Sequence, residues 1–195
     1  MYRIPPEEWD QGMSLERYLE GIVNNKPVFL ASSRAELLSG FTRRVDEARA
    51  VVDRLRTLPA GRIVAIVEDW CTDAFTTLGF WVRFAGELGW ELKVFRRDAE
   101  PDLMSHFLRN GRARSIPVYA FYTRNLEPLF WFSGRHPKGD HFKEEHLGGR
   151  AYDDLSTREK IVFRKALTRY YEEYLFEETI LDLLQSLVEH VSNRR

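Results

Sequence analysis

The chain has 195 residues, of which 44% are hydrophobic and 13% aromatic, which predicts one domain with a sizeable core and argues against disorder. Basic and acidic residues nearly balance, 29 against 30, so the charge gives no reason to expect nucleic acid or an anionic membrane as partner. A single cysteine excludes an internal disulfide. MYRIPPEEWDQ lacks the apolar core of a signal peptide, and no stretch has the roughly 18 apolar residues of a membrane span. We therefore expect a cytoplasmic protein.

Residues 1–60 form a predicted helical N-terminal extension. SLERYLEGIV is typical of a helix that begins after Ser14 as its N-cap. Residues 35–58 place apolar side chains at helical spacing, which predicts one helix that LPAG (58–61) ends. The apolar stripe of that helix is Leu38, Phe41, Val45, Ala48, Val52 and Leu55.

Residues 61–136 change character and predict the order β-α-β-α-β-β. The β-branched run 62–67 is typical of a strand buried on both faces, and a helix from about Asp73 should end at Gly89. The remaining expected elements are a strand at 90–95, a helix within 100–111, and strands at 116–122 and 128–133. The crossover rule makes the first β-α-β unit parallel, and the last two strands should form an antiparallel hairpin.

The C-terminal part is expected to be a loop over residues 137–155, with a short helical turn near 142–147, followed by helices over 156–195. STRE resembles a capping box that begins at Ser156. We expect two helices with a break at 176–179 rather than one long helix. Residues 1–195 are thus predicted to form a single domain with helical extensions at both ends of an α/β core.

The chemistry of the chain centres on Cys71, which lies where a strand stops and a helix begins. Free amides at a helix N-terminus stabilise a thiolate and lower its pKa. The nearby carboxylates of Asp69 and Asp73 would raise that pKa if they point at the sulfur. The sequence leaves this balance open, and a lone cysteine can also be a small buried apolar residue.

The motif WCTDA (70–74), together with RSIPVY further along the chain, resembles the thioredoxin superfamily. WCTDA stands where that family has W-C-G-P-C, and Ile116-Pro117 stands where it has an X-Pro bond in the cis form. The chain looks most like a bacterial branch with W-C-G-D-A or W-C-G-D-C and a W-G-x-R-P element, represented here by FSGRHP. The resemblance implies a thioredoxin-like fold, with Cys71 as the attacking cysteine and Pro117 presenting an extended partner chain beside it. The partner-binding residues that it implies are Trp70, Thr72, Asp73, Ile116, Pro117 and Arg135.

The departures from the family pattern leave three functions open. Ala74 replaces the resolving cysteine, and Ala65 replaces the buried acid that serves it, so a dithiol cycle cannot be completed within the chain. Cys71 could attack a disulfide and be released by a low-molecular-weight thiol or another protein's cysteine. It could instead be a sensor that is oxidised or thiolated reversibly. Finally, the proline groove could be a redox-inactive binding surface.

No metal or resident cofactor is expected. His136, His141 and His146 recur at a spacing that suits helical metal pairs poorly, and we interpret them as solvated loop histidines. The expected partners are protein thiols or disulfides, or a low-molecular-weight thiol as co-substrate, with no nucleic acid and no membrane. The chain is expected to be a monomer or a weak dimer.

Overall fold

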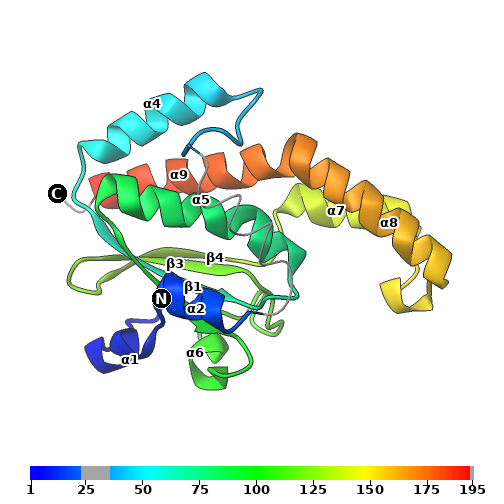
Figure 1. Cartoon of the computed structure of the whole chain (residues 1–195), viewed down its shortest axis with the longest axis horizontal. Coiled ribbons are helices and arrows are strands. Elements are labelled where there is room, and N and C mark those ends of the chain that lie inside the picture. Colours follow the sequence, from blue (N-terminus) through cyan, green and yellow to red (C-terminus); the bar gives the residue numbers. More distant parts are fainter. Residues whose placement is uncertain (23–35, 194–195) are drawn as a thin grey trace.

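The computed structural model describes residues 1–22 and 36–193, which are built around a four-stranded mixed sheet (Figure 1). The strands are β1 (Gly61–Val67), β2 (Glu91–Arg96), β3 (Val118–Thr123) and β4 (Pro128–Ser133), in the order β2-β1-β3-β4. β2 pairs with β1 in parallel, whereas β3 is antiparallel to both β1 and β4. The predicted parallel β-α-β unit and the antiparallel hairpin are both confirmed.

Helices cover both faces of the sheet, which explains the unbroken apolar run of β1. Ile63, Ala65 and Val67 pack into the larger core under α4 (Val45–Arg56), α5 (Thr72–Leu88) and α9 (Phe176–Ser192). Val64 and Ile66 point the other way, toward α1 (Pro6–Gln11) and α6 (Pro101–Ser105). Figure 1 shows α5 and α9 on one face of the sheet, with α4 lying beyond them, and α1 and α6 on the other face.

The N-terminal predictions hold in part. Ser14 caps α2 (Leu15–Glu20) by accepting from the Arg17 amide, as its position predicts. The helix expected over 35–58 is shorter, because α4 begins at Val45 and residues 37–40 form a turn; residue 35 lies outside the described residues. The stripe still marks the buried side, since Phe41, Ala48, Val52 and Leu55 are in the core.

The loop expected over 137–155 is wrong, because α7 (Pro137–Leu147) is an 11-residue helix. Its ends carry strong signals: Pro137 occupies the first turn, the His136 ring accepts from the Lys138 amide, and Gly148 ends the helix at φ 56°. A short 3₁₀ turn η1 (Tyr152–Asp154) follows. The helix has few apolar positions, and so its period is weak in the sequence.

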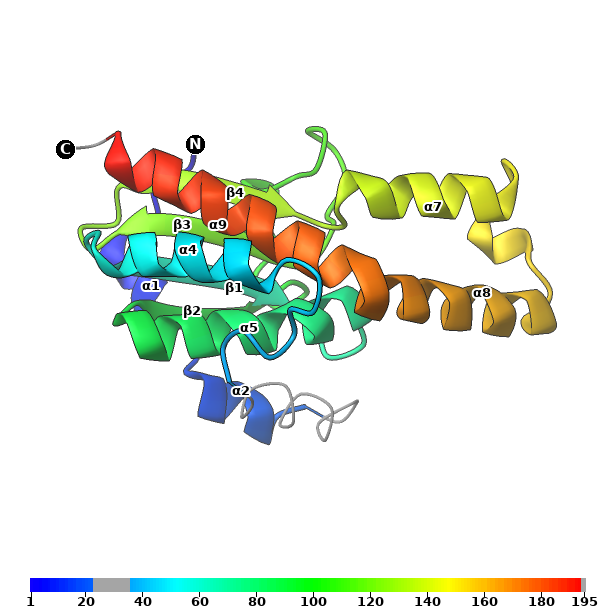
Figure 2. The same cartoon turned by 90° about the horizontal axis from the view of Figure 1, so that it is seen from above.

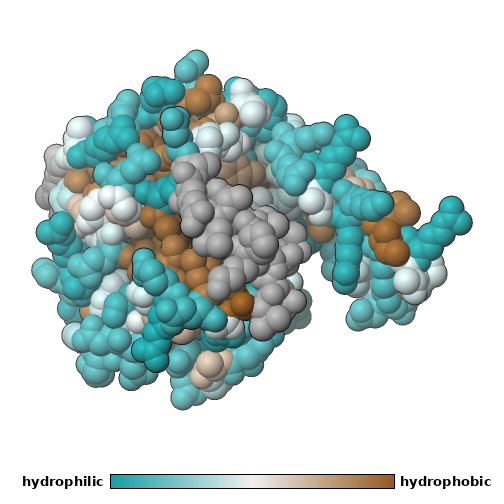
Figure 3. Space-filling model, in the orientation of Figure 1, coloured by the Kyte–Doolittle hydropathy of each residue, from teal (hydrophilic) through white to brown (hydrophobic). Residues whose placement is uncertain are grey.

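α7 and α8 (Thr157–Tyr170) form an arm that extends beyond the sheet (Figures 1 and 2). Leu147, Leu155 and Phe163 form a small core within it. Ile161 and Val162 of α8 are exposed, and part of the arm's surface is apolar in Figure 3.

The break expected at 176–179 is also wrong. The capping box at Ser156 begins α8 as predicted, and the chain then passes through a π-helical turn η2 (Tyr171–Leu175) directly into α9. Tyr171 and Phe176 both have right-handed helical backbone angles. The π turn therefore widens the helix locally, over residues 171–175, and does not interrupt it. None of the described helices is long and apolar enough to cross a membrane.

Candidate functional site

The site lies where the end of β1, the start of α5 and the segment before β3 meet. Cys71 is the N-cap of α5, with an extended backbone, and its amide donates to the Glu68 carbonyl over 3.1 Å. Its thiol donates to the carbonyl of Ile116, 3.6 Å away and 45 residues further along the chain. The bond between Ile116 and Pro117 is cis. The attacking-cysteine position and the proline segment are thus in direct contact.

A buried ion pair lies beside the cysteine. Arg135, in the loop after β4, places Nε and an Nη nitrogen each 3.0 Å from Oδ2 of Asp73. Asp73 is only 7% exposed, and its pKa is raised because burial outweighs the effect of Arg135. Tyr171, from the π turn, is buried, and the charges of Asp73 and Arg135 both affect its pKa, which burial raises. Sequence analysis missed Tyr171, because nothing in the helical pattern around it distinguishes it from other core aromatics.

The electrostatic environment keeps the Cys71 sulfur protonated. Burial raises the pKa of Cys71, the carboxylate of Asp73 raises it further, and the result is about 11. The main chain of Ala74 and Asp73, at the helix start, and the charge of Arg135 lower the pKa, but they do not offset the first two effects. The helix N-terminus therefore fails to acidify this thiol.

The outer edge of the site is aromatic and cationic. Trp70 is 51% exposed, and the guanidinium of Arg97 stacks 4.7 Å from its ring centroid. Arg114 donates to the Arg97 carbonyl over 2.9 Å. Beyond Pro117, Arg109 donates to the Arg135 carbonyl over 3.0 Å and forms an ion pair with Asp140.

The structure brings together most of the predicted site residues. Cys71, Asp73 and Arg135 form one connected group with the Ile116–Pro117 segment, and both Ile116 and Pro117 are buried. Trp70 lies at the exposed edge, and Thr72 is the first residue of α5.

The two positions that depart from the family pattern are part of the core. Ala65 is fully buried within β1, and Ala74 is 2% exposed in the first turn of α5. The polar group next to them is a pair of hydroxyls instead: Thr77 Oγ1 lies 2.8 Å from the hydroxyl of Tyr119. Neither hydroxyl supplies the proton acceptor that a resolving cysteine would need.

The predicted loop histidines, His136, His141 and His146, differ in their surroundings. His136 is buried, and its Nε2 lies 3.0 Å from Oδ2 of Asp182, so its interpretation as a solvated loop residue is wrong. His141 and His146 lie exposed on α7, where the His146 ring contacts the Phe142 carbonyl. Within residues 1–22 and 36–193, no group of histidine, cysteine, aspartate and glutamate is arranged to hold a metal ion.

The mixed sheet with helices on both faces, and a helix N-terminus that faces a cis-proline, define a protein with a thioredoxin-like fold. A family model described as Thioredoxin matches residues 31–140, more than half of the chain, and the chain belongs to this family. No curated protein matches it.

Two solved structures share the fold at low sequence identity. A protein of unknown function from Pseudomonas aeruginosa, PA1234, is 18% identical with a TM-score of 0.58, over 91% of this chain and 93% of that one. An HIV epitope-scaffold is 17% identical with a TM-score of 0.58, over 93% of this chain and 95% of that one.

Proposed function

We propose that this protein is a redox-inactive binding protein that holds an extended segment of a partner polypeptide against Cys71 and the proline segment. The observation that carries the proposal is the contact of the Cys71 thiol with the Ile116 carbonyl, 3.6 Å away. Cys71 donates to the Ile116 carbonyl, and its pKa is raised to about 11. The thiolate is the nucleophile in thiol chemistry, and at pH 7 such a group is ionised in roughly one molecule in ten thousand.

The main chain beside Cys71 supports binding of an extended segment. Within the described part of the chain, the amide of Ile116 makes no main-chain hydrogen bond, and the Ile116 carbonyl accepts only the weak thiol donor there. An extended partner strand pairs with groups of this kind. Trp70 supplies an exposed aromatic surface next to them, of the type that anchors protein interfaces.

The charges around the groove favour an acidic partner segment. Arg97 stacks on Trp70, and a cleft of about 550 Å³ beside Ser115 is lined by more basic than acidic side chains: Arg109, Arg112, Lys143 and Arg150 against Asp140 and Glu144. Arg112 and Lys143 form no ion pair within the described part of the chain. Complementary charge speeds association and selects among partners.

A peptide-display selection tests this proposal. A random-sequence peptide library would be selected on the wild-type protein under reducing conditions, and binding of the enriched peptides would be measured for Trp70→Ala, Cys71→Ser and the surface control Val162→Ala. We expect acidic peptides whose affinity falls about fivefold or more in Trp70→Ala and with added salt, and is unchanged in the other two variants. Peptides that bind only through the Cys71 sulfur, or no peptide sensitive to Trp70, would refute the binding function.

Monothiol exchange is the second candidate, and one observation favours it. Cys71 is the N-cap of a 17-residue helix, the position that stabilises a thiolate, and the main chain of Ala74 and Asp73 there lowers the pKa of its thiol. The Cys71 thiolate would attack one sulfur of a partner's disulfide, form a mixed disulfide and release the other sulfur as a thiolate. A low-molecular-weight thiol would then attack the mixed disulfide and free Cys71, because Ala74 cannot.

The two functions differ in their response to a small disulfide. Oxidised glutathione would be incubated with the wild type and with Cys71→Ser, and the mixed disulfide would be measured by intact mass. Rapid adduct formation at pH 7 that Cys71→Ser abolishes would establish exchange or reversible thiolation. Adduct formation that becomes fast only above about pH 10 would support the binding function.

A further inference from the structure

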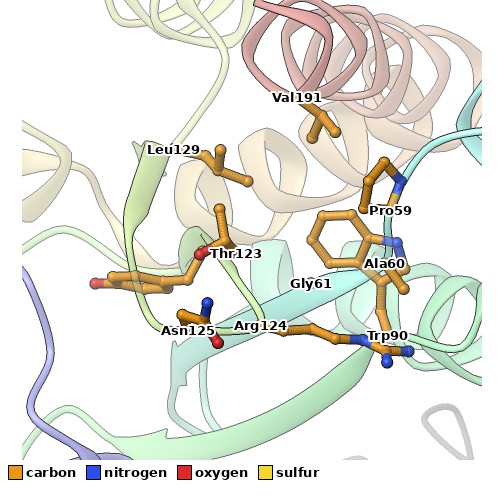
Figure 4. Close-up of a pocket in the computed structure, with 10 residues that line it drawn as sticks. Pro59, Ala60, Gly61, Trp90, Thr123, Arg124, Asn125, Leu129 and Val191 are labelled. Carbon is orange, nitrogen blue, oxygen red and sulfur yellow. The ribbon is translucent and has the colours of Figure 1, made fainter. Parts of the chain in front are cut away.

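A second cavity lies at the end of the sheet opposite Cys71. Cys71 follows the end of β1, whereas this cavity is formed around the start of β1 by residues 59–61, together with Trp90 and the turn between β3 and β4. Its volume is about 260 Å³. Figure 4 shows the lining side chains arranged around one space, with Leu129 and Val191 on one side and Arg124 on the other.

The body of the cavity is apolar and firmly built. Trp90 is 6% exposed and packs against Phe84 and Phe121, with ring centroids 5.7 and 6.4 Å away. β1 approaches the indole closely because residue 61 is glycine: a Cβ there would lie 2.8 Å from the Trp90 ring. Leu129 and Val191 complete the wall and are nearly buried themselves.

The polar edge of the cavity is held by a rigid turn. The Thr123 amide donates to the Glu127 carbonyl over 2.9 Å, and the Leu126 amide donates to the Thr123 carbonyl over 3.0 Å. Leu126 has a positive φ of 61° and is 3% exposed, so its side chain anchors the turn in the core. The two residues between these anchors, Arg124 and Asn125, are therefore presented at a fixed place beside the cavity.

Arg124 is the feature that points to a ligand. It is exposed and forms no ion pair within residues 1–22 and 36–193. In Figure 4 its side chain extends along the edge of the cavity toward Trp90, and the Asn125 amide lies on the same side. An apolar space with a few convergent polar groups, one of them cationic, is the usual composition of a small-molecule site.

We infer that this cavity binds a small carboxylate with an apolar body. The body would pack between Trp90, Leu129 and Val191, and the carboxylate would accept hydrogen bonds from Arg124 and Asn125. The volume lies below the roughly 300–1,000 Å³ of pockets for drug-sized ligands, which limits the body to about one ring or a short branched chain. This site is independent of the function proposed for Cys71.

Calorimetric titration with two matched probes tests the inference. 4-Phenylbutyrate carries the carboxylate, and 4-phenylbutan-1-ol has the same apolar body without the charge. The probes would be titrated into the wild type, Arg124→Gln, Ala60→Leu, which narrows the cavity, and Cys71→Ser as the control at the other site. Circular dichroism would check that each variant is folded.

We expect saturable one-to-one binding of the carboxylate. Arg124→Gln should weaken it about fivefold and leave the alcohol unchanged. Ala60→Leu should weaken both probes, and Cys71→Ser neither. The inference is overturned by a folded wild-type protein that does not bind the carboxylate at millimolar concentration. It is equally overturned by binding that both cavity variants leave unchanged.

Discussion

Replacing Asp73 by asparagine should make Cys71 more reactive. The pKa of Cys71 is about 11, and after burial the largest contribution to that rise comes from the Asp73 carboxylate. Asparagine keeps the size of the side chain but removes its charge, and it leaves Arg135 free to stabilise the thiolate. A neighbouring charge of the same sign raises the pKa of an acidic group by about one unit or more. We therefore expect the thiolate population at pH 7, and with it the rate of alkylation, to rise about tenfold or more.

The assay is alkylation by iodoacetamide, followed by intact mass between pH 6 and 10. For the wild type, the logarithm of the rate should rise by one per pH unit through pH 10 without a plateau, because the midpoint lies near 11. For Asp73→Asn the same curve should shift to lower pH. Asp98→Asn is the matched control, since Asp98 is an exposed carboxylate paired with Arg97 and is not among the main causes of the shift in the pKa of Cys71.

The substitution also removes one partner of a buried ion pair, so folding must be checked. Loss of a partner costs roughly 3–5 kcal/mol in a fully buried pair. Because about one fifth of the Arg135 side chain is exposed, we expect about 2 kcal/mol here, measured by urea denaturation. A wild-type alkylation midpoint below about 8.5, or a folded Asp73→Asn variant whose rate equals that of the wild type, would refute the electrostatic account of this site.

Three stability predictions can be checked by urea denaturation. Tyr119→Phe removes the hydrogen bond to Thr77, which still donates to the Asp73 carbonyl, so the cost should be about 1 kcal/mol; no change would show that the hydroxyl pair is unimportant. Glu177→Gln should cost about 2 kcal/mol, because Glu177 is 1% exposed and its carboxylate accepts from the amides of residues 42–44, directly before α4. Burial opposes ionisation of Glu177, but these hydrogen bonds lower its pKa, so the stability it adds above about pH 4.3 is lost as the pH falls through the folded-state pKa. The difference between wild type and Gln variant should therefore shrink near pH 3, and a difference independent of pH would contradict the assignment. Gly61→Ala should cost about 3 kcal/mol, since its Cβ would lie 2.1 Å from the Tyr122 carbonyl oxygen, and a neutral effect would show that β1 can move away.

The parts of the site that the sequence predicts are those determined by strand order. A parallel unit followed by a hairpin places the last residues of β1 and the first residues of β3 at the same end of the sheet, because those two strands are antiparallel. The proximity of Cys71, which follows β1, and Pro117, which precedes β3, is therefore predicted by that topology. The same argument places the loop after β4 at this end of the sheet, because β4 is antiparallel to β3. It explains why Arg135 could be predicted as a site residue.

The parts that the sequence does not predict depend on packing between distant elements. Tyr171 reaches Asp73 and Arg135 only because a π turn continues α8 into α9, and neither the turn nor its position has a periodic signature. The α7 helix was missed because its apolar positions are few. The pKa of Cys71 depends on the depth of burial and on the direction of one carboxylate, and neither can be obtained from residue spacing.

The residues placed by strand order and those placed by packing together determine how reactive Cys71 is. In a dithiol protein, the attacking cysteine needs a low pKa and the resolving cysteine needs a proton acceptor. Here the position of the second cysteine is a buried alanine, and the cation that could stabilise a thiolate at Cys71 is instead paired with Asp73. The missing second cysteine and the ion pair of Arg135 with Asp73 are separate features, and both lower the capacity for thiol exchange, while Trp70 stays exposed to a partner. The absence of a second cysteine and the pairing of Arg135 with Asp73 both act against thiol exchange, and this is the physical reason for preferring binding over catalysis.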